Sequence, residues 1–467
     1  LSENPLFMGE YHQPFKNSSL YTEFGFTEGY KKTSNKKNDG SKSHFFSKFV
    51  KNFRGTNNSD NNLAITTQSV SNNKYLKLYD IKTDLVDNNN ETLENKIEFS
   101  RETENTFIGF NASVYEDLAN NNEYEYILPE IIVDKNLSNN QFGSIDLQSN
   151  LKMHNFDTNK VTRSLINDIN WSSQDVYFKS SLKNKFLTKI RNINYENKNI
   201  DLFKEDFTNE LHGALAMYSE LSLEKENGSK KHKLKPKTFL RFAPGSMRKE
   251  TSGERLTPLS AFSIDRLNSL TNFETGLSGT LGFDYQISDN NNNNELNFSV
   301  AQIINEKKSE KMHHKTSLNS KLSDLVGNAN FKINDNFQLN YNFSLDHNYD
   351  DLIYNEFGAT TRFGPVLMKY DYLQEKKHIG NQDYIKANIE IKNGDKGIFS
   401  FNGKRNLITN SSEFYDLSYE YINDCLRAGL VYRREFYNDS ELEPENSIMF
   451  KVTLSPLGNI NSPSFNK

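Results

Sequence analysis

The feature that most constrains this chain is an alternation of apolar and polar residues with a period of two. From Phe337 to Asp346 every odd position is apolar and every even position is polar. The same alternation runs through Ile385–Ile391 and Ile448–Leu454. Successive side chains of an extended strand point to opposite faces, whereas these apolar sets would scatter around an α-helix. The chain is therefore expected to form two-faced β-strands.

The composition narrows the class of protein further. Of 467 residues only 35% are hydrophobic, yet 12% are aromatic, and a disordered chain would be poor in aromatics. No apolar run approaches the roughly 20 residues that a membrane-spanning helix requires. The 56 basic residues are balanced by 61 acidic ones, which argues against a dedicated nucleic-acid-binding protein. A single cysteine excludes a disulfide within the chain.

The connections between the expected strands are of two kinds. Tight ones such as Asn393–Gly394 and Asn334–Asn336 contain residues that tolerate left-handed backbone angles. Others, such as Asn227–Lys237 and Lys307–Lys315, are long and strongly polar. No break in composition marks a second domain. This arrangement is typical of an up-and-down meander of antiparallel strands.

A two-faced sheet can form either a soluble sandwich or a membrane barrel. In a sandwich the apolar faces pack on each other, whereas in a transmembrane barrel they contact lipid and the polar faces line a wet lumen. The barrel explains the low apolar content, because it has no large apolar interior. We expect an all-β fold, a large antiparallel up-and-down transmembrane β-barrel of about 20–26 strands. A soluble β-sandwich, solenoid or fibre is the alternative.

The sequence contains no recognisable catalytic, cofactor or metal motif. Neither a Gly-x-Ser-x-Gly elbow nor a His-Glu-x-x-His motif is present, so we expect no enzyme and no cofactor. The basic cluster Lys230–Lys237 is expected to be a solvated loop, or alternatively a surface that contacts anionic glycolipid phosphates. Cys425 precedes an expected strand, and either a buried inert thiol or a disulfide to a partner outside this chain would suit it.

The C-terminal part resembles a known family. Asp424-Cys425 precedes a strand that reads Gly429-Leu430-x-Tyr432-Arg433-Arg434, followed by Glu443-Pro444-Glu445-Asn446-Ser447, a last strand and a Pro456-Leu457-Gly458 tail. In this order the elements resemble the end of the LptD (OstA/Imp) family of outer-membrane lipopolysaccharide assembly proteins. Weaker similarities lie upstream, where Tyr75–Ile81 resembles a strand end of the alphaproteobacterial branch and Ser263–Leu267 resembles a later barrel segment.

The resemblance implies a domain organisation. Residues 1–458 would be the barrel, without its first strands, and 459–467 would be a polar tail. The family's N-terminal periplasmic β-jellyroll has no counterpart here, so we expect a truncated chain. In the family, cysteines near this C-terminal position form disulfides with the N-terminal domain, which favours that role for Cys425. Family members carry an adjacent cysteine pair where this chain has one, so two bridges are not expected.

The resemblance also implies a function, namely placing lipopolysaccharide in the outer leaflet of a Gram-negative outer membrane. The sugar part would pass a hydrophilic lumen and the acyl chains would leave through a seam between first and last strands. The expected partners are lipopolysaccharide, membrane lipid, an LptE-like lipoprotein plug and an LptA-like periplasmic bridge. The alternative is a large outer-membrane channel or receptor for solute uptake. The expected seam strand contains Ile448, Phe450, Val452, Leu454 and Pro456, and the expected lumen-facing residues are Gln338, Asn340, Asn342, Lys386, Glu390, Arg427, Arg433 and Lys451.

Overall fold

The computed structural model of the chain is almost entirely β-structure. It describes residues 6–28, 41–79, 81, 83–85, 92–119, 123–157, 159–178, 181–200, 206–267, 269–289, 294–377, 380–394, 396–423, 426–436, 446–454, 458–461 and 465–466. Within these residues there are 27 strands in one sheet. Every ladder between neighbouring strands is antiparallel, which confirms the predicted fold class.

The strands differ in length but follow one another as hairpins. The first half comprises β1 (Phe7–Pro14), β2 (Ser18–Glu28), β3 (Ser41–Arg54), β4 (Asp60–Val70), β5 (Thr92–Thr103), β6 (Thr106–Asp117), β7 (Glu123–Asn140), β8 (Gly143–Phe156), β9 (Lys160–Ser172), β10 (Val176–Phe178), β11 (Leu182–Lys198), β12 (Thr208–Leu221), β13 (Leu223–Asn227) and β14 (Lys230–Ala243). The second half comprises β15 (Gly276–Asp289), β16 (Asn294–Asn305), β17 (Leu325–Asn334), β18 (Phe337–Leu345), β19 (Leu352–Phe363), β20 (Val366–Glu375), β21 (Gln382–Asn393), β22 (Gly397–Asn406), β23 (Ser411–Ile422), β24 (Leu426–Glu435), β25 (Asn446–Leu454), β26 (Gly458–Asn461) and β27 (Phe465–Asn466).

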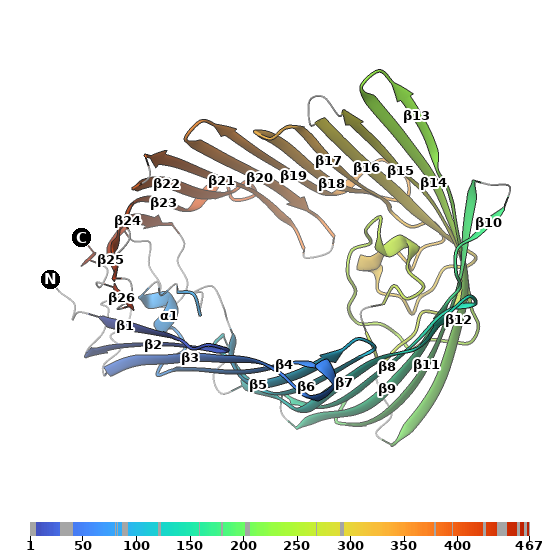
Figure 1. Ribbon diagram of the computed structural model, residues 1–467, viewed down its shortest axis with the longest axis horizontal. Helices are drawn as coiled ribbons and strands as arrows, with labels where there is room; N and C mark the ends of the chain where they lie inside the picture. The colour runs from blue at the N-terminus through green and yellow to red at the C-terminus, as the bar shows by residue number, and fades with distance from the viewer. Residues whose placement is uncertain are drawn as a thin grey trace.

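The sheet curves round until its ends meet (Figure 1). Three short strands, β10, β13 and β27, pair only along the side of one neighbour, which leaves 24 strands in sequence. β26 pairs with β25 on one side and with β1 on the other, where Met8 lies opposite Asn461 and Gly9 opposite Ile460. The two ends of the sheet therefore lie side by side and pair at Met8 and Gly9 of β1.

The two faces of the sheet differ in exposure as the alternation predicts. On β14, Arg241 is 1% exposed, whereas its neighbours Leu240 and Phe242 are 53% and 49% exposed. On β11, Arg191 is 1% exposed and Ile190 is 41% exposed. In this sheet the apolar face is exposed and the charged face is buried, whereas a soluble protein has the opposite arrangement. Such an arrangement is typical of a barrel in lipid.

The connections at the two rims are unequal. At one rim β5 and β6 are joined across residues 104–105 and β21 and β22 across 394–396. In the latter turn Gly394 has φ +63°, a left-handed angle that glycine adopts without strain. The opposite rim carries longer connections, among them 244–275 and 306–324. One expected long loop is wrong, because Lys230–Lys237 belongs to β14, where Lys230–Leu234 pairs with β13 and Lys237 pairs with β12.

The C-terminal residues differ from the expected polar tail. Gly458–Asn461 forms β26, which lies between β25 and β1, and Phe465–Asn466 forms β27 beside β25. The strand next to β1 is therefore β26 and not the expected last strand Ile448–Leu454, which is β25. All four residues of β26 pair with Lys451–Leu454 of β25. The sheet therefore extends beyond residue 458, where the barrel was expected to end.

Candidate functional site

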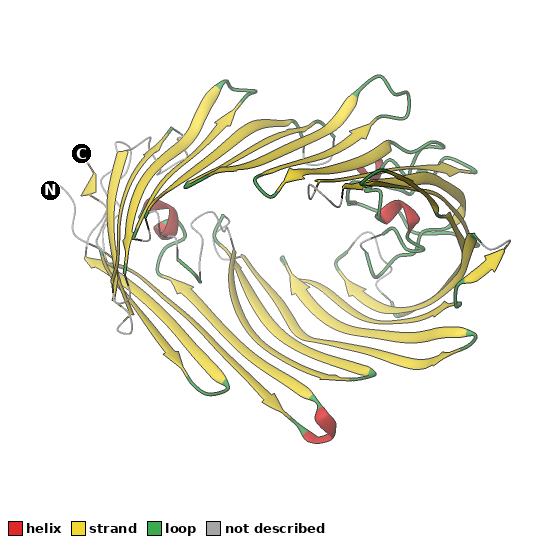
Figure 2. Ribbon diagram, turned by 45° about the horizontal axis from the view of Figure 1, so that its top comes forward, coloured by secondary structure: helices red, strands yellow, loops and turns green. Residues whose placement is uncertain are grey.

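The long connection 244–275, called the inserted loop below, folds inside the ring of strands (Figures 1 and 2). It joins β14 to β15 and contains a short 3-10 helix, Ser260–Phe262. The segment Ser263–Leu267, which the family resemblance suggested as a barrel segment, lies in this loop and not in a strand. A segment that fills part of the interior is a candidate for the functional site of a barrel, because it limits what can pass.

A buried ionic cluster fastens the inserted loop to β9 and β11. The Arg191 guanidinium donates two hydrogen bonds to the Asp168 carboxylate, at 2.7 and 2.6 Å, and its Nη2 lies 2.8 Å from Asp265 Oδ2 of the loop. Lys189 Nζ lies 2.8 Å from Asp168 and 3.2 Å from Asp265. Arg191 also donates to the backbone carbonyl of Asn272 at 3.1 Å. Two cations and two carboxylates thus neutralise each other, as buried charges require.

A second cluster holds the end of the loop against β14. The Arg266 guanidinium donates to both carboxylate oxygens of Glu274, and Arg241 donates to the backbone carbonyl of Ile264 at 2.7 Å. Burial would raise the pKa of the Glu274 carboxyl, but the charges of Arg266 and Arg241 outweigh burial and hold that pKa below its usual range. Glu274 is therefore ionised at neutral pH.

Apolar packing completes the attachment of the loop. Met247, Leu256 and Ala261 of the inserted loop form one cluster with Ala301, Ile303 and Val326 of the wall. Met312 and Leu318, from the second long connection 306–324, join the same cluster. Arg255 pairs with Glu375 of β20 at 3.2 Å, which ties the loop to a distant part of the wall. Both long connections therefore pack as one body against the inner face.

A one-turn helix, α1 (Tyr75–Leu78), lies inside the ring near β1–β3 (Figure 1). The expectation that Tyr75–Ile81 ends a strand is wrong, because Tyr75–Leu78 forms this helical turn. Tyr75, Leu76 and Ile81 are buried in a cluster with Phe46 of β3 and Leu93 of β5, which a helical turn allows because it gathers apolar side chains that a strand would place on both faces. The Tyr75 hydroxyl is 3.0 Å from His44 Nδ1, and His44 Nε2 is 3.5 Å from the buried Glu23 carboxylate.

The register of the sheet places the expected lumen-facing residues on one face. Val326 of β17 contacts the connections inside the ring, and residues directly opposite each other in a ladder share a face. Val326 lies opposite Ser344 of β18, and Ser344 lies opposite Tyr354 of β19. Following the facing residues in the same way from each strand to the next identifies this face on every strand up to β25. The residues on this face include Gln338, Asn340, Asn342, Lys386, Glu390, Arg427 and Arg433, and Lys451 is paired with Gly429 in the ladder between β24 and β25.

Several of these residues have polar partners on the same face. Asn342 donates to Glu356 at 2.8 Å. Arg433 Nε lies 3.0 Å from Asp416, and Arg427 Nε lies 2.5 Å from Glu420. β23 thus contributes carboxylates and β24 contributes arginines, and these opposite charges compensate each other across the ladder.

The expected seam residues lie partly in described structure. Ile448 and Phe450 are 43% and 45% exposed on the face opposite to Arg433, and Val452 pairs with Ala428 and Ile460. Leu454 is the last residue of β25. Pro456 and Cys425 lie outside the described residues. The residues that sequence reasoning missed are those of the ionic clusters, since Asp168, Arg191 and Asp265 are distant in the chain and no motif links them.

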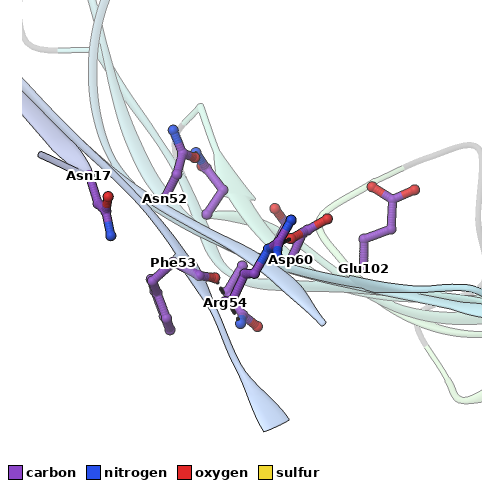
Figure 3. Close-up of a pocket in the computed structure, with 9 residues that line it drawn as sticks. Asn17, Asn52, Phe53, Arg54, Asp60 and Glu102 are labelled. Carbon is purple, nitrogen blue, oxygen red and sulfur yellow. Dashed lines mark hydrogen bonds and ion pairs between the residues drawn. The ribbon is translucent and has the colours of Figure 1, made fainter. Parts of the chain in front are cut away.

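Two other polar regions were considered as sites. A cleft of about 580 Å³ at the short-turn rim is lined by Asn52, Arg54 and Asp60 (Figure 3), but its Arg54–Asp60 pair is exposed by 89% and 79%. The basic residues Lys231 and Lys233 each lie 2.9 Å from Glu224 of β13. Both regions are open to solvent, and their charges are compensated.

Among the residues with assigned structure, no group of three or more His, Cys, Asp or Glu side chains could hold a metal ion. In the same part of the chain, no helix has both the length and the apolarity needed to span a lipid bilayer.

Among solved structures, the chain is similar to a porin variant from Rh. blastica, with 13% identity, a TM-score of 0.25, and coverage of 56% of this chain and 92% of that one. It is also similar to a ferric enterobactin receptor mutant from Pseudomonas aeruginosa, with 8% identity, a TM-score of 0.30, and coverage of 100% of this chain and 78% of that one. A comparison with curated proteins gave no match.

The family comparison is the decisive one. The model of the LptD family, described as LPS transport system D, matches residues 48–396, from β3 to the turn before β22. This range covers most of the wall, both long connections and the two ionic clusters. It ends before the Asp424–Gly458 elements that first suggested the family. The chain therefore belongs to the LptD family of lipopolysaccharide transport proteins and forms an outer-membrane β-barrel.

Proposed function

We propose that this barrel inserts lipopolysaccharide into the outer leaflet, with the sugar part in the lumen and the acyl chains leaving through a seam beside β1. The observation that carries the proposal is the weakness of one ladder. Among the residues that the structure describes, two pairs join β1 to β26, whereas eight pairs join β1 to β2. Each missing pair removes backbone hydrogen bonds, so this position is the easiest at which to part the wall.

The polar inner face supports the sugar part of the proposal. Asn340 has Asn330 and Gly358 as its ladder neighbours, and Lys386 has Asp371 and Lys404. Hydroxyl-rich sugars and their phosphates can exchange water for such amides and charges, whereas acyl chains cannot.

The partners form part of the proposal. An LptE-like lipoprotein would lie against the inner face of β21–β24, where Lys386, Glu390 and Arg433 offer charges of both signs. The upstream periplasmic domain would receive lipopolysaccharide from an LptA-like bridge and would supply the cysteine that pairs with Cys425. In the full-length protein, a Cys425→Ser variant should then lose a mobility difference between reduced and oxidised samples.

The test of the seam is a disulfide lock. Gly9→Cys combined with Ile460→Cys joins directly opposite residues of β1 and β26, where Cβ atoms of facing residues lie within disulfide reach. The matched control keeps the first change and combines Gly9→Cys with Phe24→Cys, which joins β1 to β2. The seam lock should stop surface delivery of lipopolysaccharide until a reductant is added, and the control should not.

The same variants separate the proposal from its alternative. A channel or receptor for solute uptake does not need the wall to part, so solute flux through the locked barrel would persist. Surface delivery that is equal in the locked, control and unmodified proteins would contradict a lateral exit at this position.

A further inference from the structure

A cavity of about 680 Å³ lies between the wall and the inserted loop. β8 contributes Lys152, His154 and Phe156, β9 contributes Thr162 and Ser164, and the loop contributes Thr271. The volume is within the range of small-molecule sites, which is roughly 300–1,000 Å³. The cavity lies beside the Asp168–Arg191 cluster but includes none of its residues.

The lining residues belong to the inner face. Ser164 and Ile166 of β9 are 6% and 3% exposed and have the same parity as Asp168, which contacts Arg191. Leu165 of β9 and Met153 of β8, on the opposite face, are each 39% exposed. The cavity is therefore reached from the interior and not from the lipid.

Two rings give the cavity an aromatic surface. The centroids of His154 and Phe156 are 4.4 Å apart, with 22° between the ring planes. The His154 Nε2 atom is held 2.5 Å from the Glu125 carboxylate, which fixes the imidazole. The negative face of an aromatic ring attracts the partly positive C–H groups on the face of a sugar ring. Thr162, Ser164 and Thr271 supply hydroxyl groups that can pair with sugar hydroxyls.

Two lysines, Lys152 and Lys160, line this cavity, and they differ in whether a carboxylate compensates their charge. Lys160 Nζ is 2.7 Å from Asp157, so its charge is compensated. Lys152 lies opposite Glu130 in the ladder, but Glu130 accepts a hydrogen bond from Asn150 at 3.2 Å. Among the residues that the structure describes, Lys152 has no carboxylate within ion-pair distance. An ammonium group in a partly enclosed site is a strong partner for an anion.

We propose that this cavity binds an anionic sugar, with the anionic group on Lys152 and the sugar ring on His154 and Phe156. The assignment rests on the proposed function, since it identifies where the sugar part of the transported glycolipid is held inside the barrel. The inserted loop forms one side of the site, so the two ionic clusters that fasten the loop also keep the cavity in shape.

Isothermal titration calorimetry on the purified full-length protein tests the site. The probes are N-acetylglucosamine 6-phosphate, N-acetylglucosamine and inorganic phosphate. The sugar phosphate should bind at least tenfold more tightly than either of the others. Lys152→Gln should remove this preference, and Phe156→Leu should weaken both sugars. Thr271→Trp, which fills the cavity from the loop without altering a strand, should abolish binding.

Lys404→Gln is the matched control, because Lys404 lies on the inner face of β22 and pairs with Glu413 at 2.7 Å. It should bind all probes as the unmodified protein does. Inorganic phosphate binding as tightly as the sugar phosphate would overturn the sugar assignment, and an equal loss in Lys404→Gln would show a general charge effect instead of a site. If the cavity variants bind normally while the seam lock still stops delivery, the cavity proposal fails and the proposed function stands. If the protein binds the sugar phosphate as expected but delivers no lipopolysaccharide, the cavity proposal stands and the proposed function fails.

Discussion

Arg191 on β11 and Asp265 on the inserted loop lie 2.8 Å apart inside the barrel, with the arginine side chain 1% exposed. The pair joins the wall to a segment far along the chain. Because both charges are removed from bulk water, either partner left alone would be a buried, uncompensated charge. The position of the loop therefore depends on the intact cluster.

Arg191→Met should loosen the inserted loop at a cost of about 3–5 kcal/mol, since Asp168 and Asp265 would keep only Lys189 as a partner. Arg163→Met is the control on the same two strands, because Arg163 and Glu196 are 57% and 52% exposed and such pairs contribute less than about 1 kcal/mol. Limited proteolysis followed by mass spectrometry measures cleavage within 244–275. Equal cleavage in both variants would contradict a fastening role for the cluster.

Acid should release the end of the loop. A carboxyl whose pKa is lowered by folding stabilises the folded state above its unfolded pKa and loses this contribution as the pH falls through the folded value. The pKa of Glu274 is below its usual range, so single-channel conductance in planar bilayers should be constant at neutral pH and rise below about pH 4. Glu274→Gln should show the higher conductance already at pH 7 and a smaller acid step. A conductance that does not change with pH in the unmodified barrel would refute this.

Tyr75 should stabilise α1 through packing more than through its hydroxyl. Tyr75→Phe loses the hydrogen bond to His44, at a cost of about 1 kcal/mol. Tyr75→Ala also leaves a cavity beside Phe46 and Leu76 and should cost about 3–5 kcal/mol. Unfolding midpoints in urea, read from heat-modifiable gel mobility, measure both. The prediction fails if the two substitutions have the same effect.

A lysine substitution should destabilise the apolar face of β23 and leave the polar face almost unaffected. Leu417 is 37% exposed on the apolar face, and Lys at this position should cost about 2–4 kcal/mol if it lies near the bilayer midplane. Ser418→Lys is the adjacent control on the polar face, where Ser400 is its ladder neighbour, and should be nearly neutral. Refolding into lipid vesicles at graded urea concentrations compares the two variants.

The strands could be predicted from the sequence because a period of two is a local signal. Phe337–Leu345 and Ile385–Ile391 lie in β18 and β21, and the turn at Asn393–Gly394 follows β21. Local patterns were misleading where a segment leaves the wall. Tyr75–Ile81 resembles a strand end and Ser263–Leu267 resembles a later barrel segment, but burial inside the ring selects a helical turn for the first and an irregular loop for the second.

The interior could be predicted only in part. The alternation predicts which residues of a strand share a face, and the assignment of residues such as Asn340 and Arg433 to the lumen stays a prediction. The partners of Arg191 could not be predicted, because the loop that carries Asp265 returns to the wall at a place set by packing of the whole ring. The cavity beside Lys152 also forms only because the inserted loop packs against the wall, and no sequence motif marks it.

The contrast between neighbouring ladders has a consequence for assembly. Each wall strand pairs with a strand close to it in sequence, so the sheet can grow hairpin by hairpin, while the contact of Gly9 with Ile460 needs both ends of the sheet. Ring closure is then the final event, and it becomes possible only when the growing sheet has curved fully. A variant that damages β1 or β26 should therefore accumulate as an open sheet with native strand content, held at the machinery that inserts barrels.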